Sequence, residues 1–251
     1  MQGGVLSPYL FAIYVNDIIE ILQRSGLGCH YKNVSLCIFM YADDILLLAP
    51  SVNALQQMIY ICENELELLD MVLNPKKTVC MRIGPRFNAT CNNLCTGSGV
   101  NLIWVEMFRY LGVFLVSSRE FRCSYDEAKK SFYRAFNAIF GKVGRLATED
   151  VVLKLINTKC IPTLLYGLDA CPVNSSDKAS LEFVLNRSLM KLFQTTSMEI
   201  INECCSMFNI RRIADLIAER KKRFLLRYAN GSVNQVCALF ADVALLQSAN
   251  L

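Results

Sequence analysis

The chain has 251 residues, of which 53% are hydrophobic and 19% are charged, and its formal net charge is +4. This composition excludes an intrinsically disordered chain and is sufficient for one large domain or two small ones. The longest apolar run, residues 36–50, is too short to span a bilayer and contains two aspartates, so we expect no transmembrane helix and no membrane partner.

In the first half of the chain, the hydrophobic pattern alternates between helices and strands. Helices are expected at residues 9–22 and 51–71, where apolar residues recur at helical spacing. Ser7 and Pro8 suit the cap and the first position of the earlier helix. Short runs of apolar and β-branched residues predict strands at residues 36–42, 45–49, 78–83, 101–105 and 108–116.

After residue 120, the pattern becomes helical almost throughout. Helices are expected at residues 123–143, 149–158, 178–193, 210–228 and 233–248. The predicted fold class is therefore α+β, with an antiparallel sheet and packed helices followed by an all-α module. We divide the chain into residues 1–118, a helical module at 119–200 and a C-terminal helical extension at 201–251.

Twelve cysteines are scattered along the chain with a single histidine. Their spacing does not indicate a zinc site, and no secretory signal begins the sequence. Reduced structural thiols are therefore favoured over a disulfide scaffold. These features are typical of an intracellular protein, and we expect it in the nucleus or the cytoplasm.

Charge is distributed unevenly. Residues 1–118 carry a slight excess of acidic side chains, whereas residues 119–159 and 187–228 carry an excess of basic ones. An acidic half followed by basic segments suits metal chemistry beside a polyanion. Taken alone, the charge pattern favours the plainer interpretation of solvated helix faces, and this includes the basic run at residues 220–223.

The most informative segment is residues 39–48, where Asp43 and Asp44 interrupt an apolar run. Burying two such charges without compensation costs several kcal/mol each. A tight hairpin could simply expose both carboxylates at its tip. Alternatively, the pair could hold divalent cations, since hard carboxylate oxygens suit Mg²⁺ or Mn²⁺, and two such ions stabilise the attacking and leaving oxygens in phosphoryl transfer.

Four motifs, in this order along the chain, resemble those of reverse transcriptases from non-LTR (LINE-type) retrotransposons. The Tyr-Ala-Asp-Asp sequence at 41–44 resembles the catalytic signature of that family. The Gln-Gly-Gly segment at 2–8 resembles the preceding motif, 73–78 resembles the lysine motif, and 110–113 resembles the primer-grip hairpin. The similarity covers about residues 2–195.

The resemblance implies an RNA-directed DNA polymerase with a partial palm at residues 1–118 and a thumb at 119–200. Asp43 and Asp44 would be catalytic and would bind Mg²⁺ or Mn²⁺, and Lys77 would act near the triphosphate of the nucleotide. The residues implied to bind substrate are Gln2, Gly3, Tyr41 and Ala42, and those implied to grip the primer are Tyr110, Leu111 and Gly112.

Each of these segments also has a plainer interpretation. The Gln2 loop could be an ordinary helix cap, and Tyr41 could be a core residue. Lys77 could be one of a solvated lysine pair, and Gly112 could mark a strand bulge rather than a turn. Basic residues of the first thumb helix, among them Lys129 and Lys130, could follow the backbone of a nucleic-acid duplex.

The implied partners are an RNA template, a DNA primer and deoxynucleoside triphosphates. The family places a further metal-binding aspartate before the Gln2 motif, so we expect that aspartate and the fingers in a missing N-terminal segment of the same polyprotein. The first alternative is a non-catalytic, nucleic-acid-binding remnant of a retroelement. The second is a chain without function that folds poorly because apolar surface is left exposed.

Overall fold

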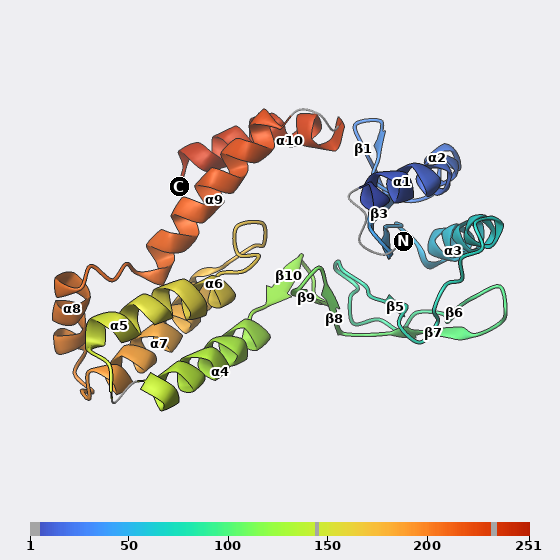
Figure 1. Ribbon diagram of the computed structural model, residues 1–251. Coiled ribbons are helices and arrows are strands. Elements are labelled where there is room, and N and C mark those ends of the chain that lie inside the picture. The colour runs from blue at the N-terminus through green and yellow to red at the C-terminus, as the bar shows by residue number, and fades with distance from the viewer. Residues whose placement is uncertain (1–5, 144–145, 232–234) are drawn as a thin grey trace. The chain divides into compact units, whose positions relative to one another are not determined.

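The structure is a computed structural model that describes residues 6–143, 146–231 and 235–251 (Figure 1). The chain separates into two compact units, an N-terminal unit (Met1–Glu106) and a C-terminal unit (Met107–Leu251). Helices and small sheets are mixed in an α+β arrangement, as the sequence predicts. Gln2 and Gly3 lie outside the described residues. In the part of the chain that is described, every helix is too short or too polar to cross a membrane.

Three helices belong to the N-terminal unit: α1 (Ser7–Tyr14), α2 (Asn16–Arg24) and α3 (Val52–Leu68). The single helix expected at residues 9–22 is therefore interrupted at Val15. Ser7 is the first helical residue rather than the cap, because Leu6 occupies the capping position. The α3 helix begins as predicted, since the Ser51 hydroxyl accepts a hydrogen bond from the Ala54 amide at 3.2 Å.

The strands of the N-terminal unit form three small sheets. Their bounds are β1 (His30–Tyr31), β2 (Val34–Ser35), β3 (Ile38–Tyr41), β4 (Asp44–Leu47), β5 (Val79–Cys80), β6 (Leu94–Cys95) and β7 (Asn101–Trp104). The pairs β1–β2, β3–β4 and β6–β7 are antiparallel, but β5 pairs with β7 in parallel. The prediction of one antiparallel sheet is therefore wrong in detail. The long connection between β5 and β7 returns the chain in the same direction, as parallel pairing requires.

One apolar cluster joins α2, α3 and the β3–β4 hairpin. Ile18 and Leu22 of α2 are fully buried against Met58 of α3. Their spacing of four residues places Ile18 and Leu22 on one face of α2, which explains the burial. Ile38 of β3 belongs to the same cluster. This core therefore supports the hairpin that carries the paired aspartates.

The C-terminal unit begins with a three-stranded antiparallel sheet in the order β10–β9–β8. Its strands are β8 (Met107–Tyr110), β9 (Val113–Val116) and β10 (Arg122–Ser124). The single strand expected at residues 108–116 is therefore a hairpin. The helix expected at residues 123–143 begins later, at Asp126, because β10 pairs with β9.

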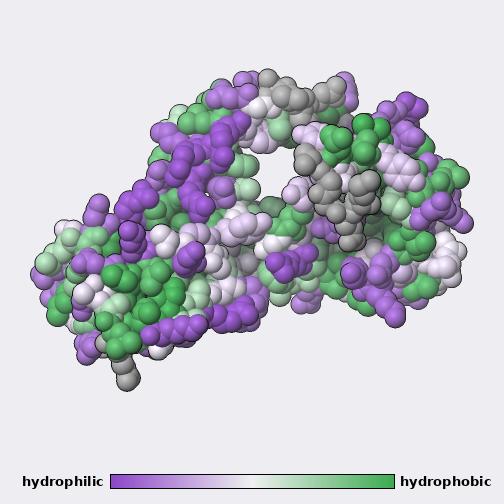
Figure 2. Space-filling model, in the orientation of Figure 1, coloured by the Kyte–Doolittle hydropathy of each residue, from purple (hydrophilic) through white to green (hydrophobic). Residues whose placement is uncertain are grey.

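Helices form the rest of the C-terminal unit. They are α4 (Asp126–Val143), α5 (Glu149–Leu155), the π-helix η1 (Ile156–Cys160), α6 (Ile161–Leu164), α7 (Ser175–Leu192), α8 (Met198–Met207), α9 (Ile213–Asn230) and α10 (Gln235–Ala249). Fully buried side chains of α4 and α7, such as Phe132 and Leu185, share one large core with η1 and α6. Neither α6 nor α8 was predicted. Figure 2 shows hydrophilic residues gathered over α9.

Candidate functional site

The paired aspartates lie at the β3–β4 hairpin. Tyr41 pairs with Asp44, which leaves Ala42 and Asp43 as a two-residue loop. Ala42 has a positive φ of 52°. Two-residue hairpin loops favour positive φ at the first loop position, because that geometry matches the twist of the strands. The sequence prediction of two strands around the aspartates is therefore confirmed within one or two residues at each boundary.

The two faces of this hairpin differ in burial. Ile38, Met40 and Ile45 lie on the face that packs into the cluster with α2 and α3. Alternation along the strands places Tyr41 and Asp44 on the opposite face. Tyr41 is 66% exposed there, so it is not the core residue that the plainer interpretation suggested.

Asp43 and Asp44 are both exposed. Among the described residues, neither carboxylate has a hydrogen-bond or ion-pair partner. The same part of the chain has no group of three or more His, Cys, Asp or Glu residues that could hold a metal ion. Two adjacent, unpartnered carboxylates fit a hard cation such as Mg²⁺, but they provide only part of its octahedral shell.

Lys77 lies in a turn that Asn74 organises. The Asn74 carbonyl accepts hydrogen bonds from the amides of Lys77 at 3.1 Å and Thr78 at 3.0 Å. The Asn74 side chain accepts a further bond from the Lys76 amide at 3.1 Å. This turn precedes β5 directly, and the Lys77 side chain is exposed without a polar partner in the described structure. Its ammonium is therefore available to an anionic ligand.

The β8–β9 hairpin has a two-residue loop, as the β3–β4 hairpin does. Tyr110 pairs with Val113, and the loop residues Leu111 and Gly112 have φ values of 46° and 84°. Positive φ at both positions is the signature of a type I′ turn, so Gly112 marks a turn and not a strand bulge. The Tyr166 hydroxyl donates a 3.0 Å hydrogen bond to the Leu111 carbonyl. Sequence reasoning gave Tyr166 no role, because its contact spans a long stretch of chain without a periodic signal.

A groove of about 560 Å³ lies beside this turn within the C-terminal unit. Arg109 of β8 and Arg134 of α4 are exposed cations on its lining, and Tyr166 forms part of its wall. Arg134 also donates a 3.0 Å hydrogen bond to the Ser131 hydroxyl. The groove therefore combines positive charge with an exposed aromatic ring, a combination that suits a nucleic-acid strand.

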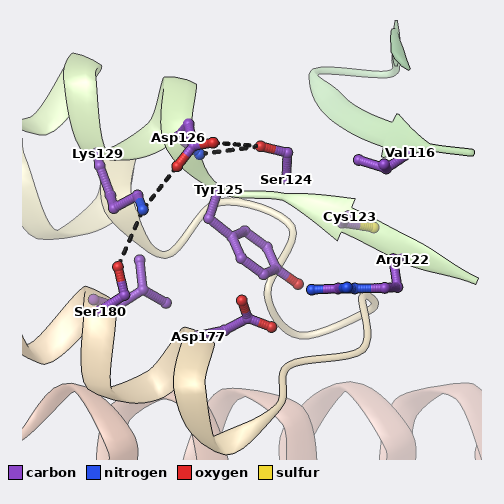
Figure 3. Close-up of a pocket in the computed structure, with 10 residues that line it drawn as sticks. Val116, Arg122, Cys123, Ser124, Tyr125, Asp126, Lys129, Asp177 and Ser180 are labelled. Atoms are coloured by element: carbon purple, nitrogen blue, oxygen red, sulfur yellow. Dashed lines mark hydrogen bonds and ion pairs between the residues drawn. The ribbon is translucent and has the colours of Figure 1, made fainter. Parts of the chain in front are cut away.

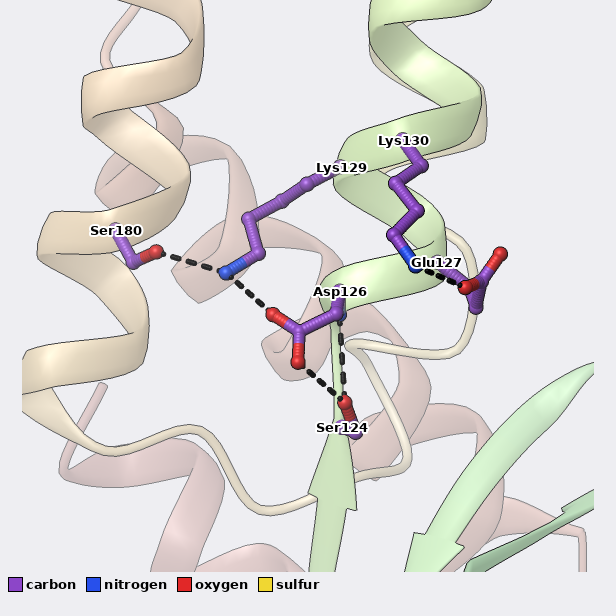
Figure 4. A network of polar contacts seen from close by, with 6 residues as sticks. All are labelled: Ser124, Asp126, Glu127, Lys129, Lys130 and Ser180. Carbon is purple, nitrogen blue, oxygen red and sulfur yellow. Dashed lines mark hydrogen bonds and ion pairs between the residues drawn. The ribbon is translucent and has the colours of Figure 1, made fainter.

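A second, smaller cavity of about 220 Å³ lies where β10, α4 and α7 meet (Figure 3). Lys129 forms a 2.8 Å ion pair with Asp126 and donates a 3.1 Å hydrogen bond to Ser180 (Figure 4). The hydrogen bond from Lys129 holds the pKa of the Asp126 carboxyl below its usual value. Tyr125 donates a 2.7 Å hydrogen bond to the Pro172 carbonyl, and burial raises the pKa of its phenol.

These contacts involve two of the basic residues of α4 that the sequence suggested could follow a nucleic-acid backbone. Lys129 is engaged by Asp126 and Ser180, and Lys130 forms a 2.7 Å ion pair with Glu127. Both ammonium groups therefore have a carboxylate partner within the protein. Acidic residues one turn earlier on α4 neutralise them, a spacing of three residues that the sequence already contained.

The cysteines are free thiols in the structure. Burial raises the pKa of the Cys62 thiol to about 11, and it does the same for Cys80 and Cys160. These thiols carry no charge at neutral pH and behave as small apolar side chains. They therefore form part of the apolar cores and not of a reactive site.

The predicted site residues divide between the two units. Five of them, Tyr41, Ala42, Asp43, Asp44 and Lys77, belong to the N-terminal unit. The predicted primer-grip residues 110–112 belong to the C-terminal unit, and they form its first turn.

Comparison with known proteins adds two findings. Residues 1–115 match the family model described as reverse transcriptase (RNA-dependent DNA polymerase). The chain is also 27% identical over 179 residues to the retrovirus-related Pol polyprotein from the type-1 retrotransposable element R2 of Popillia japonica. That match covers 66% of this chain and 24% of the relative, so it corresponds to about a quarter of the relative's length.

Proposed function

Because residues 1–115 match the reverse transcriptase family model and the chain is similar to a retrotransposon Pol polyprotein, we propose that the chain works as part of an RNA-directed DNA polymerase. In this proposal it adds deoxynucleotides to a primer 3′-hydroxyl by phosphoryl transfer that uses two metal ions. One observation carries the proposal: two adjacent carboxylates stand exposed and unpartnered, among the described residues, at the tip of a hairpin anchored in the core.

Asp43 and Asp44 are the residues that would hold Mg²⁺ or Mn²⁺. The metal would supply positive charge that neutralises the triphosphate and favours ionisation of the primer hydroxyl. The protein's contribution is rigidity, because Met40 and Ile45 fix the hairpin from its buried face. The other ligand positions would be taken by water, by phosphate oxygens and by groups outside the described residues.

Lys77 would donate hydrogen bonds to the triphosphate of the incoming nucleotide. Lys77 lies in a turn fixed by Asn74, so its backbone does not have to be ordered when its exposed ammonium binds. Tyr41, exposed on the same hairpin face as Asp44, would pack against a sugar, with Ala42 beside it. Gln2 and Gly3 lie outside the described residues, and their proposed contact with the nucleotide rests on the family resemblance.

Tyr110, Leu111 and Gly112 would grip the primer. Their type I′ turn lies beside the groove that carries Arg109 and Arg134, and Gly112 is part of the groove's lining. The template and the primer would supply the phosphates that these cations contact.

Primer extension tests the catalytic proposal. The 251-residue chain is given a DNA primer annealed to an RNA template, with deoxynucleotides and Mg²⁺. We expect Asp43→Asn and Asp44→Asn each to reduce extension by about a hundredfold or more, because each removes a charged metal ligand. Glu67→Gln, which removes an exposed carboxylate of α3, is the matched control and should extend normally.

Two outcomes would contradict catalysis by this chain: extension that survives both asparagine variants, and a wild-type chain that extends no primer. The second outcome would favour a non-catalytic nucleic-acid-binding protein. That alternative is supported by the lack of a three-ligand group among the described residues and by the hydrophilic residues over α9 (Figure 2). It predicts salt-dependent binding to the RNA–DNA duplex that Asp43→Asn leaves unchanged.

A further inference from the structure

The β8–β9 turn is held from outside the hairpin. The Tyr166 hydroxyl donates its 3.0 Å hydrogen bond to the Leu111 carbonyl, which lies at the centre of the turn. The loop of a two-residue hairpin ordinarily has its central carbonyl in solvent. Here the hydroxyl of Tyr166, which follows α6, donates to that carbonyl. The hydrogen bond connects the turn to the helical part of the same unit.

The contact around this hydrogen bond leaves no room for a side chain at Gly112. A Cβ on Gly112 would lie 2.7 Å from Cε1 of Tyr166. The adjacent Gly167 has a matching restriction, because a Cβ there would lie 2.7 Å from Cγ2 of Val113. Both glycines also have positive φ, 84° and 74°. The Tyr166–Gly167 segment and the Leu111–Val113 segment are therefore closely packed, with the Tyr166 ring against Gly112 and a Val113 methyl group against Gly167.

The support behind Tyr166 is rigid. Leu164, Leu165 and Leu168, which flank it, are at most 2% exposed and belong to the large core of the C-terminal unit. Tyr166 itself is 58% exposed despite its contacts with the turn. Tyr166 therefore adds little to the core, and the contacts that its hydroxyl and ring make are with the Leu111–Gly112 turn.

We propose that Tyr166 is a positioning residue that fixes the Leu111–Gly112 turn in the orientation that contacts the primer strand. This inference rests on the proposed function, because the turn is the proposed primer grip. Tyr166 acts through the turn. Its hydroxyl fixes the Leu111 carbonyl, its ring limits the movement of Gly112, and the buried leucines on either side keep the ring in place.

Tyr166→Phe tests the proposal, because it removes the hydroxyl and keeps the ring. We expect faster amide hydrogen exchange in peptides that cover residues 108–116, because the turn loses its external support. We also expect the dissociation constant for an RNA–DNA primer–template to rise about threefold to tenfold, the range for one lost hydrogen bond. Fluorescence anisotropy with a labelled primer measures it.

Tyr133→Phe is the matched control. Tyr133 lies on α4 in the same unit and packs on the same core, and its hydroxyl has no hydrogen-bond partner among the described residues. This variant should change neither exchange at residues 108–116 nor primer–template affinity. If Tyr166→Phe behaves like Tyr133→Phe in either measurement, the proposal is overturned.

The same design separates this inference from the proposed polymerase function. If the wild-type chain extends no primer but Tyr166→Phe loosens the turn and weakens binding, the positioning role stands and only catalysis fails. In an active chain, Tyr166→Phe should raise the KM for primer–template, with little change in the KM for the deoxynucleotide. A merely structural defect would instead reduce the active fraction and leave both KM values unchanged.

Discussion

The two hairpins of this chain share one plan and differ in their support. Each has a tyrosine before a two-residue loop, and each tyrosine pairs with the residue that follows the loop. In the β3–β4 hairpin the loop is Ala42-Asp43, and in the β8–β9 hairpin it is Leu111-Gly112. The first tip carries carboxylates that are unpartnered among the described residues, whereas the second tip is fixed by Tyr166.

This difference indicates two ways to present a turn to a ligand. The β3–β4 hairpin is anchored along one face by the cluster with α2 and α3, and its tip carries charge. The β8–β9 hairpin lies in a three-stranded sheet, and its turn is fixed by an aromatic side chain from the helical part of the unit. A turn that binds metal must keep its carboxylates free of protein partners. A turn that contacts a nucleic-acid strand through backbone atoms can instead be held by a side chain of the same protein.

Removing the core behind each hairpin should have the largest effect on stability. Met58 of α3 and Leu164 of α6 are fully buried, behind the first and the second hairpin respectively. Met58→Ala and Leu164→Ala should each lower the free energy of unfolding by about 2–5 kcal/mol, since each leaves a cavity. Urea titration measures these changes. Trp104 fluorescence reports unfolding of the N-terminal unit, and circular dichroism reports loss of secondary structure in the whole chain.

Hydrogen exchange in the same variants makes the comparison sharper. Leu164→Ala should speed exchange at residues 108–116, because Tyr166 loses the support next to it, and should leave residues 38–47 unchanged. Met58→Ala should speed exchange at residues 38–47 and leave residues 108–116 unchanged. Equal changes at both hairpins in either variant would show that the supports are not separate.

The second turn itself should be sensitive to a single methyl group. Gly112→Ala combines a φ of 84° with a Cβ 2.7 Å from the Tyr166 ring, so we expect a loss of about 1–3 kcal/mol in the free energy of unfolding. Gly99→Ala is the matched control, since Gly99 has a φ of 80° but no atom within 4 Å of the added Cβ.

The difference between these two glycine variants measures the contact with Tyr166 separately from the backbone strain. Urea titration provides both values. If Gly112→Ala costs no more than Gly99→Ala, the ring does not restrict the turn, and the contact between Tyr166 and the hairpin is too loose to position it.

Sequence reasoning could predict the elements whose signals are local. The β3–β4 hairpin and α3 lie close to their expected positions, because apolar periodicity and a Ser51 cap act over a few residues. The start of α4 was wrong, since pairing with β9 extends residues 122–124 into a strand. The Tyr166 contact could not be predicted, because it joins residues 55 positions apart in sequence.

The smallest expected effect concerns Ala42, the residue with positive φ in the first turn. An L-residue in that region carries strain of about 1–2 kcal/mol, while glycine carries an entropy cost of about 0.5–1 kcal/mol. Ala42→Gly should therefore raise the free energy of unfolding by about 0.5 kcal/mol. Ala54→Gly in α3, where the backbone is helical, should lower it by about 0.5–1 kcal/mol.

The activity of Ala42→Gly tests whether the strained backbone at Ala42 serves substrate binding. If the Ala42 methyl group contacts substrate, as the family resemblance implies, the variant should be more stable and yet extend primers less efficiently, with a raised KM for the deoxynucleotide. Ala54→Gly should leave that KM unchanged. A stabilised Ala42→Gly protein with an unaltered KM would remove Ala42 from the proposed site, and the first hairpin would then contribute only its carboxylates and Tyr41.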